Sequence, residues 1–167
     1  MKLFKKFFRK SQKGFTLIEL LVVIGILAVL LAITLIAINP ARQFGNANNT
    51  ARRSHVTQIL NSIGQYVAEN KGNLPAEVVA LTADTPTTLN STNFPNLCGE
   101  VVPTYIPALP TNPTLNTNDV DTAACVAGVA ATPVPWATGY SITRDANNRI
   151  TVSADSTDNG VSISVTR

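Results

Sequence analysis

The longest apolar segment of the chain runs from Phe15 to Ile38, 24 residues that contain a single charged side chain, Glu19. As an α-helix this segment would measure about 36 Å, which exceeds the ~30 Å hydrocarbon core of a bilayer. A cleaved secretory signal has an apolar core of only about 7–15 residues. No small-residue cleavage site directly follows Ile38 either. The pattern therefore predicts one membrane-spanning helix over residues 15–39.

A second helical pattern follows within residues 40–72. Asn39-Pro40 separates it from the apolar run, because proline removes a helical hydrogen bond and disfavours helix at the residue before it. Apolar residues recur at three- and four-residue spacing, which is typical of a helix with one buried face. This stripe comprises Val56, Ile59, Leu60, Ile63, Tyr66 and Val67.

The two ends of this amphipathic helix differ in how clearly they are marked. Lys71-Gly72 is a typical helix end, with a basic last turn and a glycine after it. At the other end Asn49 or Thr50 is the expected N-cap. Residues 41–50, with one glycine and a run of asparagines, are either a weak helix or a melted segment, and periodicity does not decide between them.

Apolar and polar residues alternate with period two in the C-terminal segment, residues 136–167. Three such runs, at 139–143, 149–153 and 160–166, are separated by turn-forming residues, which predicts a three-stranded antiparallel meander. One face of this sheet should pack on the helix stripe, with Trp136 at the end of the core. The side chains expected on that face are Tyr140, Ile142, Ile150, Val152, Val161, Ile163 and Val165.

Residues 73–135, rich in Thr, Asn and Pro, are expected to form an ordered irregular loop with one helical turn at Glu77–Leu81. Cys98 and Cys125 both follow the predicted membrane-spanning helix, in the part of the chain expected to be exported from the cytoplasm. A disulfide can form and persist there; the alternative is two free thiols. The predicted fold is therefore α+β: a long N-terminal helical spine packed on a small C-terminal antiparallel sheet of about three strands, with a disulfide-stapled loop between them.

Charge is distributed very unevenly along the chain. Residues 1–14 carry six Lys or Arg and no acid, whereas residues 15–167 carry seven Lys or Arg against ten Asp or Glu. The basic segment lies before the apolar run, so the N-terminus should stay in the cytoplasm and the rest should be exported. The mildly acidic remainder argues against a nucleic-acid-binding domain. Arg42, Arg52, Arg53 and His55 are expected on a solvated helix face.

Residues 13–21 read Lys-Gly-Phe-Thr-Leu-Ile-Glu-Leu-Leu. Together with the basic leader and the apolar helix, this segment resembles the processing and methylation signature of type IV pilins and of the pseudopilins of type II secretion. Weaker similarities to major pseudopilins occur at residues 105–113 and 136–140. The resemblance implies that a prepilin peptidase removes residues 1–14 by cutting between Gly14 and Phe15, and that Phe15 is then N-methylated.

Glu19 is the most informative single residue, because a carboxylate inside a membrane helix costs a few kcal/mol and is usually functional. The resemblance implies that Glu19 neutralises the amino terminus of Phe15 on a neighbouring subunit during assembly. Within one chain, cutting before Phe15 places the new amine four residues from Glu19 on the same helix face. The alternative is a glutamate that reaches into the lipid headgroups near the membrane surface.

The function expected from these features is that of a structural subunit of a type IV pilus-like surface filament. Its expected partners are further copies of itself, the prepilin peptidase, an inner-membrane assembly platform and, before assembly, the membrane. One alternative is the major pseudopilin of a type II secretion system. Another is a non-polymerising, membrane-anchored binding module. No nucleophile motif or paired acids with recognisable spacing occur, so we expect no enzyme.

We predict no cofactor, no metal, and no nucleic-acid or small-molecule ligand. Asn112, Asp119 and Asp121 are weak calcium candidates, because calcium prefers clustered oxygen ligands. Major pseudopilins use a nearby loop in this way, but Asn112 stands where an aspartate is usual.

Overall fold

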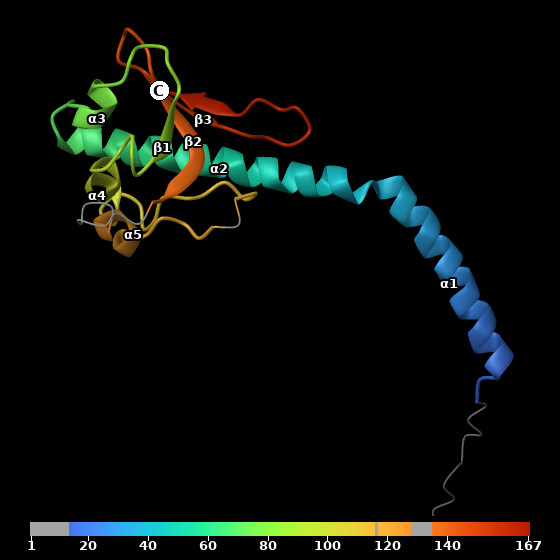
Figure 1. The fold of residues 1–167 in the computed structure, drawn as a ribbon. Helices are drawn as coiled ribbons and strands as arrows, with labels where there is room; N and C mark the ends of the chain where they lie inside the picture. The colour runs from blue at the N-terminus through green and yellow to red at the C-terminus, as the bar shows by residue number, and fades with distance from the viewer. Residues whose placement is uncertain (1–13, 116, 128–134) are drawn as a thin grey trace, which may run out of the picture. The chain divides into compact units, whose positions relative to one another are not determined.

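The computed structural model describes residues 14–115, 117–127 and 135–167 (Figure 1). The leader residues before Gly14 lie outside the described part. The chain divides into two compact units, Met1–Pro40 and Ala41–Arg167.

The first unit is dominated by α1, Leu17–Ile38, which ends at Asn39 in a left-handed conformation (φ 46°). None of its residues is buried within the chain. Among the described residues it is the one helix that is long and apolar enough to cross a membrane. The predicted break at Asn39-Pro40 is confirmed.

The main helix of the second unit, α2, spans Pro40–Glu69. It starts at proline, whose fixed φ and missing N–H suit the first helical position. The predicted N-cap at Asn49 or Thr50 is therefore wrong, because the helix already runs through residues 41–50. Past Glu69 the chain turns through Lys71 and Gly72, both with positive φ, close to the predicted end.

The sheet has four antiparallel strands in the order β1-β2-β3-β4 (Figure 1). Their bounds are Thr87–Asn90, Ala137–Arg144, Ile150–Ala154 and Ser164–Thr166. Ile142 of β2 pairs with Thr87 on one side and Val152 on the other, and Val152 pairs in turn with Val165. The predicted three-stranded meander is confirmed, although its last strand starts only at Ser164.

The segment predicted as an irregular loop contains more regular structure than expected. Besides β1 it forms the short helices α3 (Ala76–Val79), α4 (Leu97–Val101) and α5 (Thr122–Ala127). The Glu77 carboxylate accepts the backbone N–H of Leu97 at 2.9 Å and stabilises the start of α4. The predicted Cys98–Cys125 disulfide is present and buried, and it joins α4 to α5.

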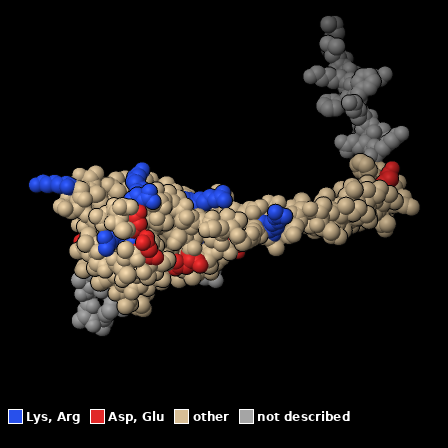
Figure 2. All heavy atoms as spheres, turned by 90° about the horizontal axis from the view of Figure 1, so that it is seen from above, with Lys and Arg blue, Asp and Glu red and all other residues tan. Residues whose placement is uncertain are grey.

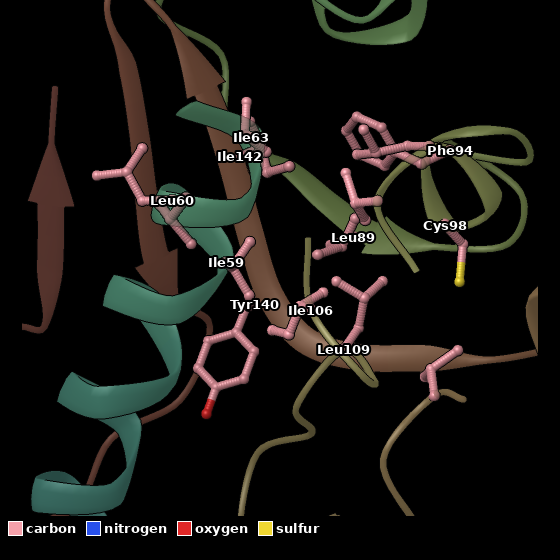
Figure 3. Close-up of a cluster of buried hydrophobic side chains, with 14 of the residues drawn as sticks. Ile59, Leu60, Ile63, Leu89, Phe94, Cys98, Ile106, Leu109, Tyr140 and Ile142 are labelled. Carbon is pink, nitrogen blue, oxygen red and sulfur yellow. The ribbon is translucent and has the colours of Figure 1, made fainter. Parts of the chain in front are cut away.

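The core lies between the C-terminal part of α2 and the sheet. Figure 3 shows Ile59 of α2 grouped with Tyr140 of β2 and Leu109 of the loop region. Of the predicted sheet face, Val161 and Val165 are only half-buried, whereas the other five residues are buried. Trp136 is 7% exposed, as expected for a residue at the end of the core.

Candidate processing and assembly site

The start of α1 is a capping box formed by Thr16 and Glu19. The Thr16 Oγ1 accepts the backbone N–H of Glu19 at 3.3 Å, and the Glu19 carboxylate accepts the backbone N–H of Thr16 at 2.7 Å. The Thr16 hydroxyl also donates to Glu19 Oε2, at 2.8 Å. This reciprocal arrangement satisfies two backbone donors that the first turn of a helix leaves without partners. Sequence reasoning missed the part played by Thr16, although its three-residue spacing to Glu19 is the usual signal.

The Gly14–Phe15 bond lies just outside this helix. Neither residue is helical, and the Phe15 side chain is 85% exposed. A β-carbon placed on Gly14 would meet no heavy atom within 4 Å. The backbone here is therefore open to an approaching protease, because no secondary structure must first be undone.

The rest of α1 is apolar on every side and uncovered. Each of its Leu, Ile and Val side chains is at least half exposed. The one hydroxyl in its interior, on Thr34, donates to the backbone carbonyl of Leu31 at 2.9 Å. Its donor is therefore paired, which lowers the cost of placing this hydroxyl in lipid. In Figure 2 the visible face of this helix is uncharged except for the acid at its N-terminal end. Such a surface is stable in a bilayer or against other apolar helices, and not in water.

In the second unit, Arg52 is buried rather than solvated, and that prediction is wrong. Its side chain is 1% exposed. The Nη1 atom lies 2.7 Å from the Asp158 carboxylate and also donates to Asn49, while Nε donates to Asn112 Oδ1 at 3.0 Å. The hydrogen bond from Arg52, followed by one from Asn48, holds the pKa of Asp158 below its ordinary value. A buried guanidinium is tolerated because its donors are paired in this way.

His55 is half-buried rather than fully solvated. Its Nδ1 lies 2.8 Å from the Tyr140 hydroxyl, and the two rings meet edge to face. Burial lowers the pKa of His55, and the charge of Asp119 partly opposes this effect. Arg53, by contrast, is exposed as predicted.

One side-chain oxygen of each calcium candidate accepts a hydrogen bond from within the protein. Asn112 Oδ1 accepts from Arg52, Asp119 Oδ1 from the backbone N–H of Thr111 at 2.8 Å, and Asp121 Oδ1 from that of Ala124 at 3.0 Å. Within the described ranges no group of three or more His, Cys, Asp and Glu side chains is arranged to hold a metal ion. Calcium binding stays a hypothesis without support from this geometry.

Comparison with known proteins bears on the first unit alone. The family described as the prokaryotic N-terminal methylation motif matches residues 9–35. No curated protein and no solved structure matches the chain. The match spans the last three basic residues before Gly14, the capping box and most of α1. The chain is thus an α+β protein with a methylation motif and a helix long and apolar enough to cross a membrane. More particularly, it carries the prepilin-type signature shared by type IV pilins and pseudopilins.

Proposed function

We propose that this protein is a structural subunit of a type IV pilus-like surface filament, cut by a prepilin peptidase between Gly14 and Phe15 and polymerised through its N-terminal apolar helix. The observation that carries the proposal is α1 itself. It is apolar all round, uncovered by its own chain, and bears one acid next to the cut site. In an anchor that only had to stay in lipid, the carboxylate would serve solely as a helix cap, at an energetic cost inside the membrane.

Cleavage changes the charge at the membrane face. Removing residues 1–14 takes away six cations that favour the cytoplasmic surface and leaves one new amine on Phe15. Glu19 Oε2 is occupied by Thr16, while Oε1 accepts no hydrogen bond within the described part of the chain. That oxygen is free to meet the Phe15 amine of the next subunit. An acid and an amine at offset positions on identical helices define a head-to-tail contact, which leads to a helical polymer.

The closest alternative is a major pseudopilin, which has the same N-terminal signature. Major pseudopilins bind calcium in a loop near Asn112, so the surroundings of this residue help to distinguish the two classes. Here the Arg52 guanidinium lies against Asn112, so a calcium ion at this oxygen would be repelled by a fixed positive charge. This supports the pilus-like subunit over a calcium-dependent pseudopilin. In a non-polymerising anchored module, Glu19 would act only as the cap of α1, and its negative charge would have no partner on another subunit.

Intact-mass spectrometry on material sheared from cells that express the native gene, with electron microscopy of the same fraction, tests the proposal. We expect filaments and the mass of residues 15–167 plus one methyl group, less two hydrogens for the disulfide. Processed protein confined to the membrane fraction, without filaments, would favour the pseudopilin. An uncut chain starting at Met1 would refute both.

Two glycine variants provide a matched pair for this experiment. Gly14→Val should block cutting and abolish filaments, because the peptidase approaches the backbone closely at this residue. Gly25→Val lies inside α1, where an added β-carbon likewise meets no heavy atom within 4 Å. It should be cut and methylated normally.

A further inference from the structure

The first part of α2 is a poor helix by its own composition. Residues 41–50 contain Gly45 and three asparagines, residue types that favour turns and caps over helix interiors. The only buried residues in this segment are Gly45 and Asn49, so it contributes no large apolar side chain to the core. A helical segment this short and this polar does not persist in water by itself. Contacts with another part of the chain must therefore hold it.

Those contacts come from the Asp158–Gly160 turn, which lies in the connection between β3 and β4. Asn49 Nδ2 donates to the backbone carbonyl of Asp158 at 2.7 Å, and Asn49 Oδ1 accepts the backbone N–H of the same residue at 3.1 Å. The Asp158 carboxylate accepts from Asn48 at 3.1 Å and from Arg52 at 2.7 Å. One turn thus contacts three polar residues of α2, Asn48, Asn49 and Arg52. In Figure 1 the red loop before β4 reaches along this helix.

Asn159 extends the contact towards the start of the helix. Its Nδ2 donates to the backbone carbonyl of Arg42 at 3.3 Å and to Asn46 Oδ1 at 3.1 Å. The approach is so close that a β-carbon on Gly45 would lie 2.7 Å from this nitrogen and 3.0 Å from the Asp158 β-carbon. Gly45, the weakest helix former in the segment, is therefore the residue that allows the turn to reach the helix.

The second part of α2 is held by different forces. Val56, Ile59, Leu60 and Ile63 are each no more than 4% exposed and belong to the hydrophobic core. Losing the polar contacts of the Asp158–Gly160 turn would not uncover these side chains. The two parts of one helix can therefore open with different free energies, as local unfolding units do.

We propose that residues 41–50 form a conditional helix: they stay helical only while Asp158 and Asn159 contact them, and they unfold locally when that turn is released, with the rest of α2 remaining on the core. The segment directly follows the break after α1, so its local unfolding would lengthen the non-helical stretch of chain between α1 and the rest of α2. This inference goes beyond the proposed filament function and does not depend on polymerisation.

Hydrogen exchange of the full-length mature protein in detergent micelles, read by mass spectrometry, tests the proposal. Asp158→Asn and Asn159→Asp keep side-chain size. The first removes the carboxylate charge that faces Asn48 and Arg52, and the second removes the amide donor to Arg42 and Asn46. Each should speed exchange of amides 45–50 by about tenfold or more and change amides 57–67 by less than about twofold. The control is Asn73→Asp, an exposed position whose side chain makes no hydrogen bond in the described part of the chain. Unchanged exchange at 45–50 in both variants, or an equal rise along all of α2, would overturn the proposal.

Gly45→Ala decides the question even if a turn variant fails to fold. Alanine favours helix more than glycine does, so a segment held by intrinsic propensity would exchange more slowly in this variant. The added β-carbon would push Asn159 away, so the proposal expects faster exchange at amides 46–50 instead. Slower exchange would refute it. Denaturation followed by the fluorescence of Trp136, the only tryptophan, shows that the variant remains folded.

Discussion

The two long helices, consecutive in sequence, satisfy opposite requirements. Helix α1 has apolar side chains on every side and none buried, whereas α2 is mostly polar and buries one narrow stripe. The first is a regular, capped helix but lacks any cover for its side chains within the chain. The second obtains its cover from the sheet of its own chain. Only α1 therefore requires surroundings supplied by lipid or by other copies.

Neutralising Glu19 tests whether α1 depends on contacts with other copies of the chain. In Glu19→Gln the amide oxygen can still accept from Thr16, since glutamine also completes a capping box, but the negative charge is lost. If the charge pairs with a neighbouring amine, filaments recovered by shearing should fall by about a hundredfold or more, because a pair in an apolar core is worth several kcal/mol. Cutting and methylation should persist in the membrane fraction. Filaments at native yield would show that the carboxylate acts only as a helix cap.

Truncating one apolar residue in each long helix tests which helix stabilises the second unit, Ala41–Arg167. Ile59 of α2 is 1% exposed, so Ile59→Ala should lower the free energy of unfolding by about 2–5 kcal/mol. Leu27 of α1 is 51% exposed, and Leu27→Ala should change it by less than about 0.5 kcal/mol. Denaturant titration of the full-length protein in micelles, followed by Trp136 fluorescence, measures both. Equal losses would mean that α1 also supports the fold.

Neighbouring arginines on α2 form a second matched pair. Arg52→Met keeps an unbranched side chain but removes the ion-pair partner of Asp158 and one donor each to Asn112 and Asn49, so it should cost about 2–3 kcal/mol. Arg53 is exposed and makes no side-chain hydrogen bond in the described part of the chain, so Arg53→Met should stay within about 0.5 kcal/mol. The same fluorescence titration applies. An unchanged free energy of unfolding in Arg52→Met would show that the buried cation makes no net contribution to stability.

The smallest expected effects concern pH. The folded pKa of His55 lies below its ordinary value of 6.5, so the unfolded chain binds more protons as pH falls. Stability should therefore be full above about pH 6.5 and decline below it until the folded His55 also titrates. In His55→Asn this decline should vanish from denaturation midpoints measured between pH 7.5 and 5.5. A slope that survives the substitution would assign it to other groups.

Asp158 titrates in a separate, more acidic window. Its folded pKa is lowered from an ordinary value of 3.8, so its contribution to stability is complete above that value. It is lost as pH falls through the lower folded pKa. Asp158→Asn should flatten this acid limb and leave the His55 window unchanged, which the same titrations would show. Loss of both limbs together would indicate that the two groups are coupled.

Much of the fold was predictable because its signals are local. The apolar run, the stripe beginning at Val56 and the alternation around Ile150 each lie within one element. The stripe and the alternation also indicate which face of their element is buried. The candidate cut site at Gly14 and the acid at Glu19 are equally local. A charge boundary and a short motif mark them, and the motif is the part of the chain that matches a known family.

Other features depended on residues far apart in the chain. Strand β1, Thr-Thr-Leu-Asn, holds one apolar residue and forms because the edge of β2 offers it backbone partners. The burial of Arg52 requires Asp158, 106 positions away. The early start of α2 requires the Asp158–Gly160 turn against Gly45.

Short-range periodicity and composition thus indicate which segment is long and apolar enough to cross a membrane, where the charge changes and which faces of helix and sheet are apolar. Three features arise only in the tertiary structure: the fourth strand, the length of α2 and the burial of Arg52. In each case a locally unfavourable conformation or a polar group is stabilised by hydrogen bonds from a distant segment, and no local pattern records such a partner.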